Sequence, residues 1–365
     1  MYEGGTDMIP FVILLTVPIV ITPFVKNIKI NRIHLKYLPL FLFFVNLTIL
    51  VMLRHKNVGN DTANYYYFVE KISRESWSMV TKEYTEVVFY LFMKAITMIS
   101  NDPRFFVAVS GLLVSAMLYP VYRRLCVDPP LTIVLFSSLS TFAMLFSGIR
   151  QMLAVGIGLI AYELVRRRKL ILFIAVVVFA VFVHTSAFML IFMYPLYHAR
   201  ITRKWLFAVI PILAVVFVFN RQIFGVLSTF IEQYTDYNAK EITTGAYSTL
   251  VMFVLFTVFS YVIPDDSFID EETNGLRNFL LLALVIQMFA PLNPVAMRMG
   301  YYYMIFIPLL VRKIIECSSV RFRKVAQIST YVLLVFFYLY FFIGATNGSK
   351  LHTIPYHFFW EYYII

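Results

Sequence analysis

Long, uninterrupted apolar segments recur along the chain, from Phe11 to Tyr340. An α-helix of roughly 20 residues crosses the hydrocarbon core of a bilayer, and several of these segments reach or approach that length. They are continuously apolar rather than alternating as lipid-facing barrel strands do, and helices satisfy their own backbone groups in lipid. The sequence therefore predicts an all-α, polytopic integral membrane protein, with residues 1–365 forming a single membrane domain.

Composition excludes several other classes of protein. With 61% hydrophobic and 14% charged residues, the chain lies far outside the range of soluble domains. The net charge of +11 comes from basic residues in short loops between apolar segments, so we expect them to set membrane orientation and not to bind nucleic acid. Two cysteines give no metal-ligand spacing, so neither a metal nor a cofactor is expected. The first ten residues carry no Lys or Arg, which favours an outer flank over a cleaved signal peptide.

The basic loops predict the topology. If they are cytoplasmic, 19 of the 31 Lys and Arg residues lie inside, as the positive-inside rule requires, and both termini lie outside. The resulting twelve or so spans are approximately 8–25, 37–53, 104–122, 130–146, 148–165, 169–183, 185–198, 204–219, 247–263, 276–292, 299–312 and 325–344. The chain would then have outer loops at about 54–103 and 220–246 and an outer C-terminal tail at 345–365.

The first outer loop contains one further apolar stretch, at 84–99. It is short for a span, and counting it as one would send Arg123 and Arg124 to the outer side. We therefore predict about 12 transmembrane helices together with re-entrant or interfacial helices on the outer face.

Seven ionisable residues reach the outer boundary in this topology. They are Arg54, Asp61, Glu83, Glu86, Arg150, His184 and Arg298. An ionisable group at membrane depth costs at least roughly 2.5 kcal/mol at a helix centre, so such groups usually face a polar cavity that has a function. Their convergence on one boundary is the main functional signal in the sequence.

The three arginines are candidate ligands of a diphosphate. Arg150 follows a break at Ser147 and Gly148, and Arg298 follows a proline-containing turn, so each could combine a cation with a helix N-terminus. Arg54 closes the second predicted span. The structural alternatives are a snorkelling side chain for Arg150 and an interfacial anchor beside three tyrosines for Arg298.

Asp61, His184, Glu86 and Glu83 are the candidate catalytic residues. Asp61 could instead cap a helix that begins near Ala63, and a lone His184 could be structural. Arginines clamp phosphates and stabilise leaving-group charge, while a carboxylate or histidine can deprotonate an attacking hydroxyl. This set of residues suits glycosyl transfer from a diphosphate-linked lipid without a metal.

Six short motifs occur in a characteristic order. They are RHKNVGNDTANY at 54–65, EVVFYLFMKAI from Glu86, SGIRQMLA at 147–154, FVHTSA at 182–187, MRMGYY at 297–302 and IPYHFF at 354–359. In this order and spacing the chain resembles the EpsG family, Wzy-like polymerases of bacterial exopolysaccharide and O-antigen assembly. The family pattern carries over to Arg54, Asp61, Arg150, His184 and Arg298 as active-site positions. Glu86 precedes Val87 and Val88 where the pattern tends to have Pro and Gly, so the local turn differs.

The resemblance implies a membrane glycosyltransferase that transfers a growing glycan from undecaprenyl diphosphate to another lipid-linked repeat unit. It implies a multi-pass protein of the bacterial cytoplasmic membrane whose active site faces outward. The implied partners are undecaprenyl-diphosphate-linked oligosaccharide, membrane lipids, a chain-length regulator and a flippase.

Two other classes of function stay open from the residues alone. A transporter or flippase of lipid-linked sugars also needs basic residues for a diphosphate, but should place ionisable groups near the midplane in related repeats, which the sequence lacks. A related membrane transferase, such as an O-antigen ligase, an enzyme that uses a monophosphate lipid-sugar donor, or an acyltransferase acting through His184, would share much of the pattern.

Overall fold

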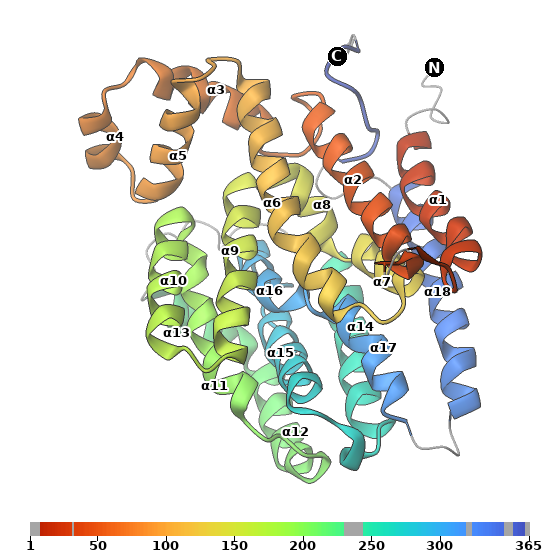
Figure 1. Ribbon diagram of the computed structural model, residues 1–365. Coiled ribbons are helices and arrows are strands. Elements are labelled where there is room, and N and C mark those ends of the chain that lie inside the picture. Colours follow the sequence, from red (N-terminus) through yellow and green to blue (C-terminus); the bar gives the residue numbers. More distant parts are fainter. Residues whose placement is uncertain (1–7, 31–32, 230–243, 319–322, 347–352, 362–365) are drawn as a thin grey trace. The chain divides into compact units, whose positions relative to one another are not determined.

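The computed structural model describes residues 8–30, 33–229, 244–318, 323–346 and 353–361, and most of these residues lie in helices (Figure 1). Within these ranges the only strands are β1 (Lys29–Ile30) and β2 (Ile33–His34), which pair antiparallel. The all-α fold class is therefore confirmed. The chain divides into two compact units. The first is Met1–Leu164, Ile171–Phe188 and Thr330–Ile365, and the second is Val165–Leu170 and Met189–Ser329.

The first unit contains most of the N-terminal half of the chain. Its helices are the 3₁₀ helix η1 (Leu35–Tyr37), α1 (Ile9–Val25), α2 (Leu38–Leu53), α3 (Thr62–Arg74), α4 (Trp77–Glu83), α5 (Val87–Thr97), α6 (Pro103–Leu125), α7 (Pro129–Ser138), α8 (Ser140–Ser147), most of α9 (Ile149–Arg166) and α10 (Leu170–Val183), and the larger part of α18 (Arg323–Thr346). Helix α2 packs against α1, α6 and α7. The buried ring of Phe11 contacts four other aromatic rings, including those of Phe146 and Tyr356, at the centre of this bundle.

The second unit is organised around one helix. Its elements are the end of the 3₁₀ helix η2 (Thr185–Phe192), α11 (Met193–His198), α12 (Arg203–Val218), α13 (Asn220–Thr229), α14 (Thr244–Val262), the 3₁₀ helix η4 (Asp266–Phe268), α15 (Glu271–Gln287), α16 (Pro294–Met304) and α17 (Ile307–Glu316). Helix α15 packs against α11, α14, α16 and α17. The middle of the predicted outer loop at 220–246 lies outside the described residues.

Helices α3, α4 and α5 form a group beside the start of α6 (Figure 1). A buried lysine joins two of them. Lys94 of α5 donates hydrogen bonds to the carbonyls of Ile72 (3.1 Å) and Ser73 (3.0 Å), near the C-terminus of α3. These carbonyls carry the negative end of the helix dipole, so the ammonium is stabilised there although only 6% of the residue is exposed. This contact fixes α5, and thereby the residue just before it, Glu86.

Two described helices are long and apolar enough to cross a membrane, Leu35–Leu53 and Pro103–Leu125. Two bent pairs would raise this number to four, Pro129–Ser138 with Ser140–Ser147 (66°) and Lys204–Val218 with Asn220–Val226 (74°). Other apolar helices, such as α1, α10 and α14, fall short by this criterion. Hydropathy depends only on the residues along the chain, so two apolar helices joined by a bend look like one continuous apolar segment. The count of about twelve spans stays a prediction from the charge pattern.

The Arg124–Glu163 ion pair and the predicted site residue Arg150 occupy opposite ends of α9. At the C-terminal end of α6, Arg124 pairs with Glu163 of α9 (2.8 Å). Arg150 lies at the other end of α9, an 18-residue helix. Membrane proteins concentrate Lys and Arg on the cytoplasmic side, so the end that carries Arg150 is the one expected to face outward.

In the second unit, several basic residues form ion pairs with acidic residues near the start of α15. Glu271 pairs with Arg168 (2.7 Å), and Glu272 pairs with Lys313 (3.0 Å). Asp266 lies 3.4 Å from the buried guanidinium of Arg277. These contacts bring basic loops distant in sequence to one end of the unit, as a shared side of the membrane requires.

Candidate functional site

The carboxylate of Glu86 joins three segments of the first unit. Its Oε2 atom accepts a 2.7 Å hydrogen bond from Nη1 of Arg150 at the start of α9. Its Oε1 atom lies 2.6 Å from Nδ1 of His184, which follows α10, and 3.0 Å from the backbone nitrogen of Thr185. Glu86 stands at the N-cap position of α5, but its side chain does not cap that helix. The structure thus brings together three of the seven predicted residues.

The partners of Glu86 keep it ionised. Burial by itself raises the pKa of a carboxyl group. The hydrogen bond from His184, the nearby charges of His184 and Arg150, and the Thr185 N–H outweigh burial and lower the pKa of Glu86 to about 2, from an ordinary value of 4.5. A carboxylate accepts hydrogen bonds only, so Nδ1 of His184 is the nitrogen that carries the proton in this contact.

Two parts of this cluster stay available for a ligand. In a neutral imidazole with its proton on Nδ1, the Nε2 atom is a hydrogen-bond acceptor. Nε2 of His184 forms no hydrogen bond with any described residue, and 20% of the side chain is exposed. About a third of the Arg150 side chain (35%) is exposed as well. When the imidazole is neutral, the cluster therefore offers a proton acceptor and a cation side by side.

Two tyrosines that the sequence analysis did not select support Arg150. The backbone N–H of Arg150 donates to the hydroxyl of Tyr65 (3.3 Å), and its Nη1 atom lies 3.5 Å from the hydroxyl of Tyr90. Tyr65 is buried at 3% exposure, whereas Tyr67, two residues later, is 63% exposed. The one signal for Tyr65 in the sequence is the amphipathic period of α3, which places Tyr65 on the buried face of the helix and Tyr67 on the exposed face.

Arg54 is fully buried and turned toward its own helix. Its Nη1 atom donates to the carbonyl of Val51 near the C-terminus of α2, and its Nε atom donates to Oγ1 of Thr62 (3.3 Å). Only 1% of the residue is exposed, and Nη2 has no partner among the described residues. Burial lowers the pKa of Arg54 to about 10, so the guanidinium stays charged at neutral pH. This arrangement satisfies helix-end carbonyls.

The C-terminal segment runs along the same end of α2. Arg54 and Phe358 form an isolated β-bridge, flanked by hydrogen bonds from His55 N to His357 O (2.8 Å) and from Phe359 N to Leu53 O (2.9 Å). Part of the predicted outer tail is therefore an integral part of the first unit. Two of the six sequence motifs, at 54–65 and 354–359, meet here.

The loop between α2 and α3 fits tightly onto the end of α8. Gly59 has a φ of +88°, and a Cβ atom there would lie 2.1 Å from the carbonyl oxygen of Phe146. The buried hydroxyl of Thr62 lies 3.1 Å from the same carbonyl. Only glycine satisfies both the backbone conformation and the close approach. The loop thereby adjoins the break that precedes Arg150.

The remaining predicted residues lie outside this cluster of contacts. Asp61 occupies the N-cap position of α3, yet its side chain makes no cap hydrogen bond and none with any other described residue. Its carboxylate is half-buried and acts electrostatically on Tyr65. Glu83 is exposed at the end of α4. Arg298 is half-buried in α16 and belongs to the second unit.

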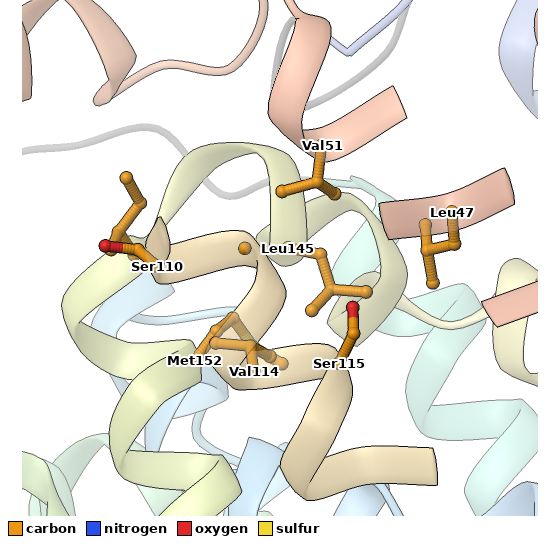
Figure 2. Close-up of a pocket in the computed structure, with 9 residues that line it drawn as sticks. Leu47, Val51, Ser110, Val114, Ser115, Leu145 and Met152 are labelled. Atoms are coloured by element: carbon orange, nitrogen blue, oxygen red, sulfur yellow. The ribbon is translucent and has the colours of Figure 1, made fainter. Parts of the chain in front are cut away.

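A small cavity lies in the first unit, bounded by α2, α6, α8 and α9 (Figure 2). Its volume is about 10 Å³, which is space for about one water molecule. Ser110 lines it with a buried hydroxyl that has no partner among the described residues, while Val51, Leu145 and Met152 make it largely apolar. It is too small for a sugar. Among the described residues, no three His, Cys, Asp or Glu side chains gather as metal ligands would.

Comparison with known families identifies the chain. The family model of the EpsG family matches residues 36–358, nearly the whole length. The chain belongs to the EpsG family. The match includes the whole cluster of Glu86, Arg150 and His184, and no curated protein and no solved structure matches the chain. Membership of the EpsG family, together with the apolar helices, makes this a membrane protein associated with the polymerisation of exopolysaccharide.

Proposed function

We propose that this EpsG-family protein is an oligosaccharide repeat-unit polymerase. It transfers a glycan from undecaprenyl diphosphate to another lipid-linked repeat unit at the outer face of the bacterial cytoplasmic membrane. The observation that carries the proposal is the His184–Glu86–Arg150 cluster, in which one carboxylate holds both an imidazole and a guanidinium. The cluster lies at the end of α9 opposite the Arg124–Glu163 pair, which supports an outward orientation.

In the proposed reaction, a hydroxyl of the acceptor unit attacks the anomeric carbon of the donor glycan. The proton of this hydroxyl passes to Nε2 of His184, and a new glycosidic C–O bond forms. The bond between the anomeric carbon and the diphosphate oxygen breaks, and its electron pair leaves with undecaprenyl diphosphate. Glu86 holds the ring by its Nδ1–H and stabilises the imidazolium, which is the role of an orienting carboxylate beside a general base.

Arg150 suits the leaving group. Its guanidinium is always charged, and the fork geometry of such a group matches phosphate oxygens. One nitrogen, Nη1, is held by Glu86, which leaves the exposed part of the fork for the diphosphate. A cation already fixed in place stabilises developing charge without reorganisation. Within the second unit, Arg298 is proposed as a phosphate ligand on the basis of its family motif and its place near the start of α16.

Asp61 is the alternative proton acceptor. Its carboxylate has no partner among the described residues, lies in the same unit as the cluster and is accessible. Arg54, by contrast, is proposed to act indirectly, since its contacts with Val51 and Thr62 hold the end of α2 against the loop that carries Asp61.

The deciding experiment uses the purified full-length protein in lipid bilayers with a synthetic undecaprenyl-diphosphate-linked repeat unit. A polymerase produces a ladder of glycans, whereas a ligase or single transferase stops after one addition. A flippase produces neither, but moves the labelled lipid between leaflets. A ladder that disappears in His184→Ala and Glu86→Gln but persists in Glu70→Gln, which changes an exposed carboxylate of α3, supports the proposal. A full ladder from His184→Ala and from Glu86→Gln would refute the assignment of the site.

A further inference from the structure

A second hollow lies in the first unit, at the C-terminal end of α6 and the start of α2. Tyr37, Tyr119, Pro120, Arg123 and Arg124 line it, and its volume is about 390 Å³. It is far larger than the cavity beside Ser110. It lies at the end of α6 away from α3 and α5, so it is separate from the Glu86 cluster.

The polar groups in this hollow suit a phosphate. Arg123 is exposed and forms no ion pair with any described residue. Arg124 is held by Glu163 (2.8 Å) and lies over the ring of Tyr162 (5.7 Å), so its guanidinium is oriented in advance. The exposed Lys36 lies 4.7 Å from the ring centroid of Tyr37 and adds a third positive charge, while Glu163 and Asp128 are the nearby carboxylates.

Two hydroxyls supplement these charges. Those of Tyr37 and Tyr119 form no hydrogen bond with any described residue. Tyr119 is fixed by edge contacts with the rings of Phe41 (5.7 Å) and Phe44 (5.9 Å) on α2. Arginine forks together with tyrosine hydroxyls provide charge-assisted and neutral donors for phosphate oxygens.

An apolar surface leads away from the hollow along both helices. On α2, Phe41, Val45 and Ile49 are 46%, 37% and 43% exposed at a spacing of four residues. On α6, Leu112, Ala116 and Pro120 are also exposed, at the same spacing of four residues. An apolar helical face next to a cluster of basic residues suits a phospholipid, whose acyl chains contact the apolar face while its headgroup binds the basic residues.

We propose that this hollow binds the phosphate of an anionic phospholipid, with the acyl chains along the exposed faces of α2 and α6. A free phosphate would use the charges but would leave the apolar faces uncovered. The continuity of the hollow with Phe41, Val45 and Ile49 favours the lipid. Occupancy would tie α2 to α6 at the end opposite the Glu86 cluster.

The test is a lipid titration of the purified full-length protein followed by native mass spectrometry. The probes are phosphatidylglycerol, phosphatidylcholine and inorganic phosphate. We expect phosphatidylglycerol to be retained in preference to phosphatidylcholine, and Arg123→Gln to weaken its retention about fivefold, the effect of one basic residue near an anionic lipid. Tyr119→Phe, which keeps the ring and all charges, should weaken retention by a smaller factor.

Arg167→Gln is the matched control, since it removes one exposed charge that does not line the hollow. Equal loss in Arg123→Gln and Arg167→Gln would overturn the proposal in favour of diffuse surface charge. Equal retention of the two lipids by the wild-type protein would overturn it as well. If millimolar inorganic phosphate binds in an Arg123-dependent way while phosphatidylglycerol does not, the hollow is a site for free phosphate and the lipid assignment is wrong.

Discussion

His184 and Arg150 bind the same carboxylate: Nδ1 of His184 lies 2.6 Å from Oε1 of Glu86, and Nη1 of Arg150 lies 2.7 Å from Oε2. The two oxygens of Glu86 thereby set the separation of a base and a cation. Neither group can be displaced without affecting the other. The experiments below separate the chemical role of this cluster from its structural one.

Replacing Glu86 by Gln should abolish the ladder almost completely. The amide keeps the size of the side chain but loses the charge that orients His184 and neutralises Arg150. Loss of an orienting carboxylate beside a histidine base costs roughly 10²–10⁴-fold in rate. Initial rates of repeat-unit addition in bilayers measure this, with Glu70→Gln as the control. A rate within threefold of wild type would contradict the role given to Glu86.

Asp61→Asn tests the alternative proton acceptor: if Asp61 takes the proton, this variant should lower activity without lowering stability. A lost N-cap costs about 1 kcal/mol, but the Asp61 side chain does not cap α3, so that cost should be absent. The melting temperature and the rate are measured on the same preparation. Unchanged melting with a lower rate indicates a chemical role. A lower melting temperature with a proportional loss of folded protein would instead restore the structural interpretation.

Acid should remove the stabilisation that Glu86 provides. Its folded-state pKa of about 2 lies below the ordinary 4.5, so the unfolded chain binds more protons between these values. The contribution, on the order of 3 kcal/mol, is therefore complete above about pH 4.5 and declines as the pH falls toward 2. The difference in melting temperature between wild type and Glu86→Gln should be full at pH 7 and fall to less than half of that value at pH 3. A constant difference would show that the carboxylate is not depressed in pKa.

Gly59→Ala should destabilise the first unit strongly. The new Cβ would meet the carbonyl of Phe146 at 2.1 Å, and the positive φ adds about 1–2 kcal/mol for a non-glycine residue. Gly225→Ala is the control, because nothing lies within 4 Å of a Cβ at that helical position, and alanine there should stabilise by roughly 0.5–1 kcal/mol. Thermal unfolding in detergent compares the two. Equal effects would mean that the loop does not pack as described.

Lys94→Met should lower both stability and activity. The ammonium donates to two carbonyls near the C-terminus of α3, and hydrogen bonds to a charged group contribute about 1.5–3 kcal/mol. Its loss frees α5 and therefore Glu86. Lys82→Met changes an exposed lysine of α4 and should leave both properties close to wild type. Melting temperature and initial rate are measured for both variants. If Lys94→Met behaved like Lys82→Met, Lys94 would not hold α5 in the way described.

The sequence predicted the helical fold class and the candidate residues that the structure brings together. Continuous apolar runs require helices, and the cost of a charge at membrane depth selects seven candidates, among them Glu86, Arg150 and His184. These residues are separated by 64 and 34 positions, so neither periodicity nor spacing could show that one carboxylate joins them. Their meeting depends on the packing of α3, α4 and α5 beside α6.

Other features could not be predicted for reasons that are equally physical. The break at Leu139 bends an apolar stretch by 66° without any charged residue to signal it. The orientation of the Arg54 side chain depends on which backbone carbonyls it can reach, and the position where α2 ends puts the carbonyl of Val51 within reach. Lys94 did leave a signal, since it is the single charge within the apolar stretch of α5.

The buried lysine of α5 has a consequence for which positions of α3 tolerate substitution. Lys94, Tyr65 and Thr62 bear the internal contacts of α3 and α5, while Asn64 and Tyr67 of α3 are exposed. Substitutions at the exposed positions leave the scaffold of the catalytic cluster intact. The exposed surface of α3 can therefore change in composition without disturbing the contacts that hold Glu86, Arg150 and His184 together.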